Sequence, residues 1–219
     1  MNDCIERKLI KQILVLLEKP FLEKGDRLVC FGDSITEEPT GYVSFLAKKL
    51  EVMGIELINA GVGGDKTTTA LPRIFPDVIN HKPTAVSIFF GANDFCHGHG
   101  RWSHEPQIAW QTLRDNLKWI VHICRLNGIQ KFSINVLPDE LEGTVLAEYG
   151  SRMEHLRATQ LAAEEAKTLC VNLNYVFGMG KNFHEYSENG LLYTRDGIHP
   201  TEFAAEIIAE TMLHCWKMD

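Results

Sequence analysis

The chain alternates between short, almost continuous apolar runs and longer segments with helical periodicity. Each apolar run is ended by Gly, Asn or Pro, as expected of strands that are covered on both faces in a parallel sheet. The predicted strands are Arg27–Phe31, Ile55–Asn59, Ala85–Phe90, Lys131–Val136 and Leu169–Leu173. The predicted helices are Cys4–Glu18, Val43–Met53, Ala70–Ile79, Ile108–Asn127, Met153–Lys167 and Glu202–Trp216.

This alternation of strands and helices predicts a doubly wound α/β sandwich. No internal repeat, low-complexity segment or linker divides the sequence, so we expect residues 1–219 to form one domain. In such folds the ligand site lies beyond the carboxyl ends of the strands. The residues that follow each predicted strand are therefore the first place to look for chemistry.

Composition and charge exclude a few classes of partner. Hydrophobic residues make up 45% of the chain and charged residues 23%, which is ordinary for a globular protein. The net charge is -7, and no basic run or aromatic-basic interleaving occurs, so we do not expect a nucleic-acid partner. Near the N-terminus the longest apolar stretch, Ile13–Leu17, is too short for a secretory leader or a membrane span. We therefore expect a cytoplasmic protein that does not insert into membranes.

Six cysteines occur singly along the chain. Cys30 and Cys170 fall inside predicted strands. This placement predicts buried thiols in a reducing compartment rather than a disulfide framework.

Four polar segments follow strands or precede the last helix, and together they contain the groups needed for acyl transfer. Such transfer through a serine needs an exposed hydroxyl, an imidazole base, a group that orients the imidazole, and donors for the oxyanion. Ser34 would be the nucleophile, His199 its base and later the acid, and Asp196 the orienting carboxylate. The segments are Gly32-Asp33-Ser34, Asn59-Ala60-Gly61-Val62-Gly63-Gly64-Asp65, Gly91-Ala92-Asn93-Asp94 and Asp196-Gly197-Ile198-His199-Pro200.

The same segments supply candidate oxyanion donors. These are the backbone N–H groups of Ser34 and Gly64 and the side-chain amide of Asn93. Glycine suits position 64 because, without a Cβ atom, its backbone N–H can approach a substrate closely.

Ser34 also fits the start of a helix. Ser34 and Glu37 have the S-x-x-E spacing of a capping box, in which both side chains satisfy backbone donors. However, Pro39 and Gly41 indicate that the regular helix begins near Tyr42. We therefore expect Ser34 on an irregular turn after the strand.

The other candidate residues have ordinary structural interpretations as well. Asn93 and the dipeptide Asp196-Gly197 are typical turn residues, and His199 precedes a proline at a helix start. It is the occurrence of all four segments together, in this order and at the strand ends, that favours chemistry over turn formation.

These four segments resemble the conserved blocks of the SGNH hydrolases, also called the GDSL esterase/lipase family. G-D-S-I matches the nucleophile block, N-A-G-V-G-G-D the glycine block, G-A-N-D the asparagine block, and D-G-I-H-P the block with the acid and base. Ile35 stands where the family's name has leucine. The resemblance covers nearly the whole chain. It implies a three-layer α/β/α sandwich with a flavodoxin-like, five-stranded parallel sheet, and hydrolysis of carboxylic esters or thioesters without a metal or an organic cofactor.

Two other kinds of site, a phosphate-binding loop and the nucleophile motif of the other common α/β hydrolases, fit the sequence poorly. A phosphate-binding G-x-x-x-x-G-K-[ST] loop ending at Lys66-Thr67 would need glycines where the chain has Ala60 and Asp65, and a carboxylate there would repel phosphate. The G-x-S-x-G motif of the other common α/β hydrolases is absent around Ser34.

The segment from Phe95 to His104 contains three histidines and a cysteine. Three histidines and a cysteine could bind zinc, but their spacing matches no standard closed site, so we expect no metal. We expect the segment to cover the substrate pocket instead, with walls completed by Pro138–Gly143 and Gly178–Arg195. A role as plain solvent loops remains open for these two segments. The candidates for substrate contact are Asp33, Phe95, Trp102 and His104.

The sequence predicts a small-molecule ester substrate, with acetyl or another short acyl group favoured by the polar, His-rich segment. Two alternatives stay open: a lysophospholipase or acyl-thioesterase acting on longer chains, and an inactive sandwich that only binds its ligand. The sequence does not predict the oligomeric state.

Overall fold

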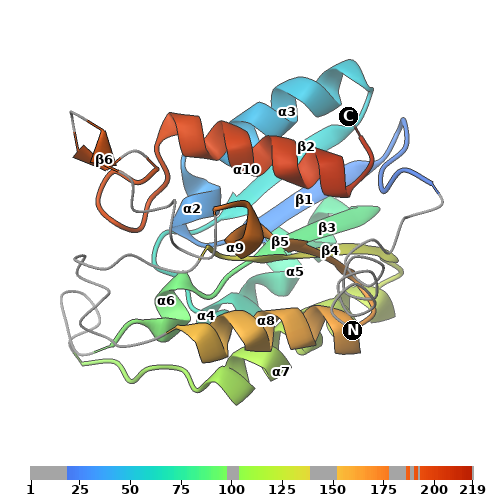
Figure 1. Cartoon of the computed structure of the whole chain (residues 1–219). Coiled ribbons are helices and arrows are strands. Elements are labelled where there is room, and N and C mark those ends of the chain that lie inside the picture. Colours follow the sequence, from blue (N-terminus) through green and yellow to red (C-terminus); the bar gives the residue numbers. More distant parts are fainter. Residues whose placement is uncertain are drawn as a thin grey trace, which may run out of the picture.

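A parallel sheet forms the centre of the protein. The computed structural model of the chain describes residues 19–97, 104–138, 152–177, 186–187, 190–191 and 193–218. Five strands in the order β2-β1-β3-β4-β5 pair only in parallel (Figure 1). The predicted flavodoxin-like sheet is confirmed, with strand ends within two residues of those expected. The strands are β1 (Arg27–Gly32), β2 (Glu56–Gly61), β3 (Ala85–Phe89), β4 (Lys131–Val136) and β5 (Leu169–Asn172).

Helices cover both faces of the sheet, which makes the three predicted layers (Figure 1). Alternate side chains of a strand point to opposite faces. Leu28 and Cys30 of β1 therefore join the core beneath α3 and α10, whereas Val29 and Phe31 join the core beneath α7 and α8. The four covering helices are α3 (Tyr42–Val52), α10 (Glu202–Cys215), α7 (Trp110–Leu126) and α8 (Met153–Glu165).

The helix predicted over Ala70–Ile79 is the largest error in the secondary structure. The chain forms a series of single turns there, because Pro72 and Pro76 lack the N–H that a continuous helix would need. The series also begins earlier than expected, at Thr67. It consists of α4 (Thr67–Ala70), η1 (Leu71–Arg73), α5 (Ile74–Asp77) and η2 (Ile79–His81).

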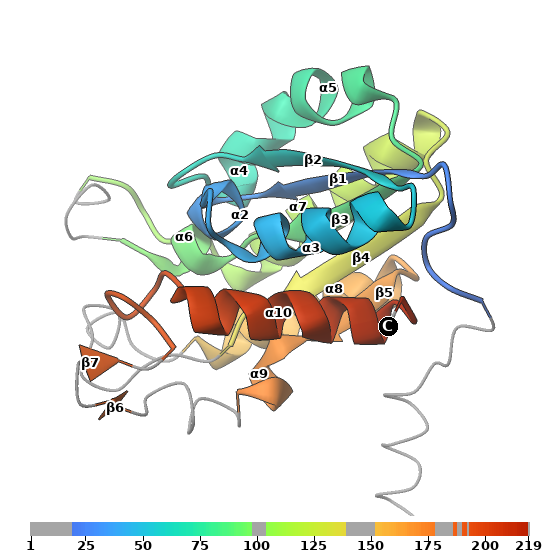
Figure 2. The ribbon, with the colours of Figure 1, turned by 90° about the horizontal axis from the view of Figure 1, so that it is seen from above.

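The remaining short elements lie around the carboxyl ends of the strands or after β5. Figure 2, seen from above, shows α2 and α6 at the same end of the sheet. The predicted N-terminal helix, Cys4–Glu18, lies outside the described residues. The short elements are α2 (Ser34–Glu37), α6 (Ala92–Phe95), α9 (Leu173–Val176), and the antiparallel pair β6 (Tyr186–Ser187) and β7 (Gly190–Leu191).

The described cysteines are all free thiols, in line with the expected lack of a disulfide framework. Cys30 is buried as predicted. Cys170 is exposed, so its predicted burial is wrong: it lies on β5, which is an edge strand of the sheet. Over the described ranges, no helix has both the length and the apolar character needed to cross a membrane. The cytoplasmic location stays a prediction.

Candidate active site

The candidate active site lies at the carboxyl ends of two adjacent strands, β1 and β3, whose following segments lead to opposite faces of the sheet. β1 and β3 are adjacent in the sheet although β2 lies between them in the sequence. The chain leaves β1 into α2, which contains Ser34, and leaves β3 into α6, which contains Asn93. This is the topological switch point at which open α/β sheets bind their ligands. The fold thus brings two of the four predicted segments to one place.

The structure also brings the C-terminal segment to this place and connects the three predicted catalytic side chains in a row. Nε2 of His199 lies 2.9 Å from Oγ of Ser34, and Nδ1 of the same ring lies 2.6 Å from Oδ2 of Asp196. With a proton on Nδ1, the ring donates to the carboxylate and accepts from the serine hydroxyl. Ser34 and His199 are 165 residues apart in the sequence.

The segment that carries Asp196 and His199 is held in a tight loop before α10. The loop closes through an antiparallel bridge, with the N–H of Arg195 donating to the carbonyl of His199 (2.9 Å). Oδ1 of Asp196 accepts the backbone N–H groups of Ile198 (2.9 Å) and His199 (2.8 Å). Gly197 has φ +90°, a left-handed conformation that favours glycine. One carboxylate therefore both shapes the loop and orients the imidazole.

Hydrogen bonding sets the charge of these two side chains. Burial alone would raise the pKa of Asp196, but the hydrogen bonds from the His199 ring and from two backbone N–H groups hold it well below its usual value. The hydrogen bond to Asp196 raises the pKa of His199, while partial burial and Arg195 oppose that rise. Asp196 is thus a carboxylate at neutral pH.

The local structure at Ser34 differs from the irregular turn predicted. Ser34 is the first residue of α2, a single helical turn, and Asp33 is its N-cap. A carboxylate oxygen of Asp33 accepts the N–H of Ile35 (3.0 Å), which is the task that the capping interpretation gave to Ser34. Aspartate is as good an N-cap as serine. Because Asp33 caps the helix, the Ser34 hydroxyl is left to interact with His199.

The predicted oxyanion donors lie in the segments that follow β1, β2 and β3. In the described part of the chain, neither the N–H of Ser34 nor that of Gly64 has a hydrogen-bond acceptor. Such an open N–H is expected at the first position of a helix. Gly64 has φ +79°, so glycine is favoured there by backbone conformation as well as by the close approach that the sequence suggested. Nδ2 of Asn93 donates one proton to the carbonyl of Asp65 (3.0 Å), which fixes the amide and leaves its second N–H for another acceptor.

Sequence reasoning missed a buried link that joins α6 to the glycine-rich segment. The Asp94 carboxylate accepts the backbone N–H of Thr67 (3.0 Å) and its hydroxyl, and Asn116 donates to that hydroxyl (3.0 Å). Burial raises the pKa of Asp94 to about 6, and the bonds from Thr67 limit the rise. Asp94 and Thr67 are visible in the sequence only as neighbours of the motifs, because nothing in the spacing indicates that they pair.

Two hollows flank the Ser34–His199 pair. The first is mainly apolar, and three of its lining residues, Ile35, Ala92 and Ile198, directly adjoin Ser34, Asn93 and His199 in the sequence. The second contains His199 itself together with the charged side chains of Glu38 and Arg195. Both hollows share Ile35 and Pro200. Lining the first are Ile35, Phe89, Ala92, Leu137, Pro138, Arg152, Gly197, Ile198, Pro200 and Ile208.

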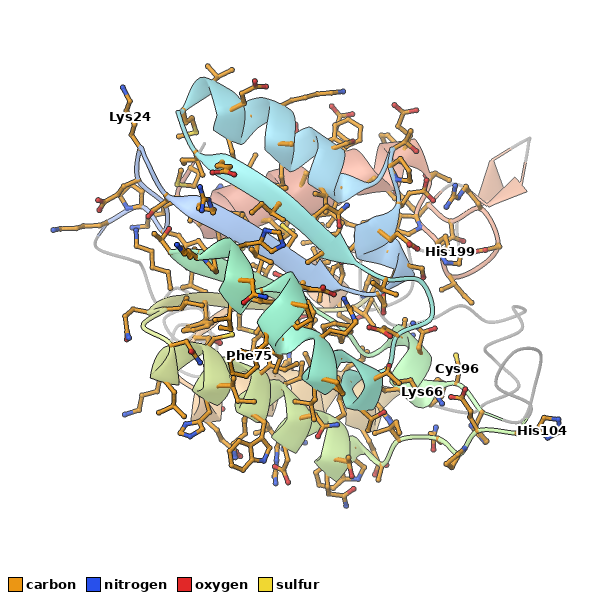
Figure 3. All side chains as sticks on the ribbon, turned by 180° about the vertical axis from the view of Figure 1, so that it is seen from behind. Lys24, Lys66, Phe75, Cys96, His104 and His199 are labelled. Atoms are coloured by element: carbon orange, nitrogen blue, oxygen red, sulfur yellow. The ribbon has the colours of Figure 1, made fainter. Side chains whose placement is uncertain are left out.

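The predicted substrate contacts are only partly accessible. Asp33 and Phe95 are each 1% exposed, so contact with substrate is not supported for either. Asp33 turns inward to cap α2, and the Phe95 ring packs against His155 with 5.3 Å between centroids. His104 is exposed and projects outward from the ribbon (Figure 3). Trp102 lies outside the described residues.

Of the two predicted wall segments, Pro138 lines the first hollow and Arg195 the second. Most of both segments lies outside the described residues. The part of the chain that the structure describes contains no group of three or more His, Cys, Asp or Glu side chains placed to hold a metal. The prediction that no metal is needed stays a prediction, since residues 98–103 are not described.

A serine, a histidine and an aspartate in a row at the switch point of a three-layer sandwich form an arrangement suited to acyl transfer. A family model described as the GDSL-like Lipase/Acylhydrolase family matches residues 30–207. The chain belongs to this family, and it is a carboxylic ester hydrolase.

Several known proteins are similar to the chain. An acetylxylan esterase from Geobacillus stearothermophilus is 34% identical over 173 residues, which cover 70% of this chain and 78% of that protein. An uncharacterized lipoprotein from Bacillus subtilis is 28% identical over 145 residues, and the match spans 58% of its length and 59% of this chain. An isoamyl acetate-hydrolyzing esterase 1 homolog from Mus musculus is 43% identical over 77 residues, covering 31% of this chain and 30% of that protein.

Solved structures share the fold. An α/β-hydrolase enzyme from the metagenome of Lake Arreo, Spain, superposes with a TM-score of 0.76 at 19% identity, covering 91% of this chain and 99% of that one. The crystal structure of an acetylxylan esterase from Geobacillus stearothermophilus gives a TM-score of 0.70 at 22% identity, covering 90% and 96%. The predicted architecture is therefore confirmed.

Proposed function

We propose that the protein hydrolyses small esters with short acyl groups, acetyl above all, through an acyl-enzyme on Ser34. The observation that carries this proposal is the contact of 2.9 Å between Oγ of Ser34 and Nε2 of His199, whose ring is held from behind by Asp196 at 2.6 Å. This is the spacing at which a base can take a proton from a hydroxyl.

In the first half of the reaction, Nε2 of His199 accepts the Ser34 proton while Oγ attacks the ester carbonyl carbon. The carbonyl oxygen becomes an oxyanion, and the N–H groups of Ser34 and Gly64 and the amide of Asn93 supply donors for it. The tetrahedral intermediate then collapses. The bond to the leaving oxygen breaks, and His199 gives its proton to that oxygen, so the alcohol departs and the acyl group stays on Ser34.

In the second half, a water molecule attacks the acyl carbon while His199 takes one of its protons. The acid leaves, and His199 returns the proton to Oγ of Ser34. Throughout both halves the Asp196 carboxylate keeps the proton of the resting ring on Nδ1 and stabilises the imidazolium that forms.

The two hollows suggest where the parts of the substrate lie. The leaving oxygen must be near Nε2 of His199, and the hollow that contains His199 also contains the Glu38 and Arg195 side chains. A polar alcohol, such as a sugar hydroxyl, suits this side. The mainly apolar hollow, which is lined by Ile35, Ala92 and Ile198 among others, suits the methyl group of an acetyl ester. Two relatives are named for acetyl esters, the acetylxylan esterase and the isoamyl acetate-hydrolyzing esterase homolog, which supports the same assignment.

A panel of nitrophenyl esters graded from acetate to decanoate tests the proposal, with Ser34→Ala as the blank and an acetylated sugar as the natural-type substrate. We expect the highest kcat/KM on acetate, release of acetate from the sugar, and an acyl group on the Ser34 peptide after rapid quenching. The Ser34→Ala variant should fold with an unchanged thermal midpoint and show no turnover. An optimum at long chains would favour the lysophospholipase or thioesterase alternative. Tight ligand binding without turnover would favour the inactive sandwich.

A further inference from the structure

Lys66 is a charged residue that is almost fully buried beside the candidate active site. Its side chain is 4% exposed, and its ammonium has one acceptor for each of its three protons. The acceptors are the carbonyl oxygens of Cys96 (3.3 Å) and Pro106 (3.1 Å) and the carboxylate of Glu105 (3.0 Å). Figure 3 shows Lys66 and Cys96 next to each other. Burying an ammonium is strongly unfavourable unless such partners compensate for the lost water, so the three acceptors are what allow Lys66 to stay charged inside the protein.

The acceptors of Lys66 belong to the two ends of one chain segment. Cys96 directly follows α6, whereas Glu105 and Pro106 lead toward α7. The same two ends are joined by the N–H of Ile108, which donates to the carbonyl of Asp94 (2.9 Å), and by the amide of Gln107, which donates to the carbonyl of Phe95 (3.0 Å). Residues 94–96 and 105–108 therefore form a closed neck. Lys66 attaches both sides of this neck to the glycine-rich segment after β2.

The attachment is one of three successive links between that segment and α6. The carbonyl of Asp65 accepts Nδ2 of Asn93, and Thr67 donates twice to Asp94. Lys66, between them, reaches the carbonyl at the end of the helix. α6 has only four residues, and a single helical turn does not hold its shape without outside contacts. The position of Asn93 therefore depends on these links.

We propose that Lys66 is a positioning residue for the oxyanion hole. By clasping the neck, its ammonium sets the distance between the Asn93 amide on α6 and the Gly64 N–H, which lies two residues before Lys66. The inference rests on the proposed function, because it assigns Lys66 to the same reaction. Donors must lie close to 3 Å from the developing oxyanion to stabilise it, so even a small shift of α6 slows the chemical step.

The test compares Lys66→Met, which keeps the length of the side chain but has no charge or donors, with Lys49→Met on the exposed side of α3 as a matched control. Lys66→Met should lower kcat for a short-acyl nitrophenyl ester about 10-fold with little change in KM, part of the 10²–10³-fold cost of losing one oxyanion donor outright. Lys66→Arg, which retains charge and donors, should recover most of this loss. Unchanged kcat in Lys66→Met would overturn the proposal.

A double-mutant cycle with Asn93→Ala separates positioning of the oxyanion hole from a general structural role. If Lys66 acts through Asn93, the double variant should have a kcat within about twofold of Asn93→Ala alone, because the donor that Lys66 positions is already gone. If the two losses multiply, Lys66 does not act through the oxyanion hole and the proposal is wrong.

Hydrogen–deuterium exchange gives a readout that needs no activity. Peptides covering residues 92–97 and 104–109 should take up deuterium faster in Lys66→Met than in the wild type or Lys49→Met. Unchanged uptake would show that Lys66 does not hold the two sides of the neck together, and would overturn the proposal. If Lys66→Met does not fold, Glu105→Gln removes the negative charge from the exposed partner of the ammonium while keeping the shape of the side chain. The Glu105→Gln variant should still exchange deuterium faster at the neck. It should lower kcat about twofold in the presence of Asn93 and leave kcat unchanged in the Asn93→Ala background. Failure of either expectation overturns the proposal. A wild-type protein without ester turnover would refute the proposed function. The exchange comparison would still show whether Lys66 holds the two sides of the neck together.

Discussion

Two segments that meet at the candidate active site, one with Ser34 and one with His199, each contain an aspartate close in sequence to the proposed catalytic residue. The environments of these two aspartates are opposite. Asp33 precedes Ser34, is 1% exposed, and has one carboxylate oxygen without a hydrogen-bond partner among the described residues. Burial raises its pKa to about 7. Asp196 precedes His199 by three residues, its side chain is 50% exposed, and three hydrogen bonds hold its pKa low.

The difference shows that closeness to a catalytic residue does not give a carboxylate its charge. Donors do. Asp196 receives an imidazole N–H and two backbone N–H groups, so its negative charge is stabilised although it is partly buried. Asp33 receives one backbone N–H and faces the negative charges of Asp94 and Asp65, which raise its pKa further, while His199 opposes this. We therefore assign an electrostatic role in catalysis to Asp196 and a helix-capping role to Asp33.

The largest expected effect separates the two aspartates by the same substitution. Asp196→Asn should lower kcat by about 10⁴-fold, because an amide in this place no longer holds the Nδ1 proton of His199 or stabilises the imidazolium. Asp33→Asn should leave kcat within a few-fold, since asparagine is an equally good N-cap. Steady-state kinetics on a nitrophenyl acetate, with both variants checked for folding by circular dichroism, measures the contrast. Equal losses in the two variants would contradict the assignment.

The next largest effect concerns Asn93, one of the proposed oxyanion donors. Asn93→Ala should lower kcat by about 10²–10³-fold, the usual cost of one oxyanion donor, with a much smaller change in KM. The substitution also removes the bond to the carbonyl of Asp65, so thermal unfolding should be measured in parallel. Full activity in a folded Asn93→Ala protein would show that its amide does not bind the oxyanion.

The pH dependence of activity is expected to follow the protonation of His199, which Asp196 influences. A protonated His199 cannot accept the Ser34 proton, so kcat/KM should fall as the pH drops through the pKa of His199. The hydrogen bond to Asp196 raises this pKa above the ordinary 6.5, and the acid limb should therefore lie at a pH higher than 6.5. In Asp196→Asn the limb of the residual activity should move to lower pH. A limb that does not move would mean that another group controls the profile.

The smallest effect is on stability and concerns Asp33. Unfolded aspartate loses its proton near 3.8, whereas folded Asp33 keeps it until about 7, so the folded state binds more protons between these values. The free energy of unfolding should therefore fall as the pH rises through this window, and Asp33→Asn, which has no proton to lose, should escape that fall. Urea unfolding at pH 5 and pH 8 measures it. The variant should gain stability relative to the wild type at pH 8, and an equal difference at both pH values would contradict the buried, raised carboxyl.

The sequence by itself determined the architecture and the list of reacting groups. Short apolar runs that end in Gly, Asn or Pro indicate a parallel sheet, and a parallel sheet places its ligand site at the strand ends. Ser34, Gly64, Asn93, Asp196 and His199 all lie in segments at that edge, so their convergence followed from topology. Local chemistry was readable as well: the Asp196-Gly197 dipeptide predicts the turn that the loop forms, with its glycine at φ +90°.

Only the tertiary structure decided which neighbours support these groups. The pairing of Asp94 with Thr67 and the three acceptors of Lys66 depend on how segments 27 to 40 residues apart lie side by side. The burial of Asp33 and Phe95 likewise depends on tertiary packing. Which buried polar side chains meet depends on the register of the strands and on the path of the loops. Neither can be read from the hydrophobic periodicity of a single segment. Hydrophobic spacing reports which way a segment faces; it does not report what it meets there.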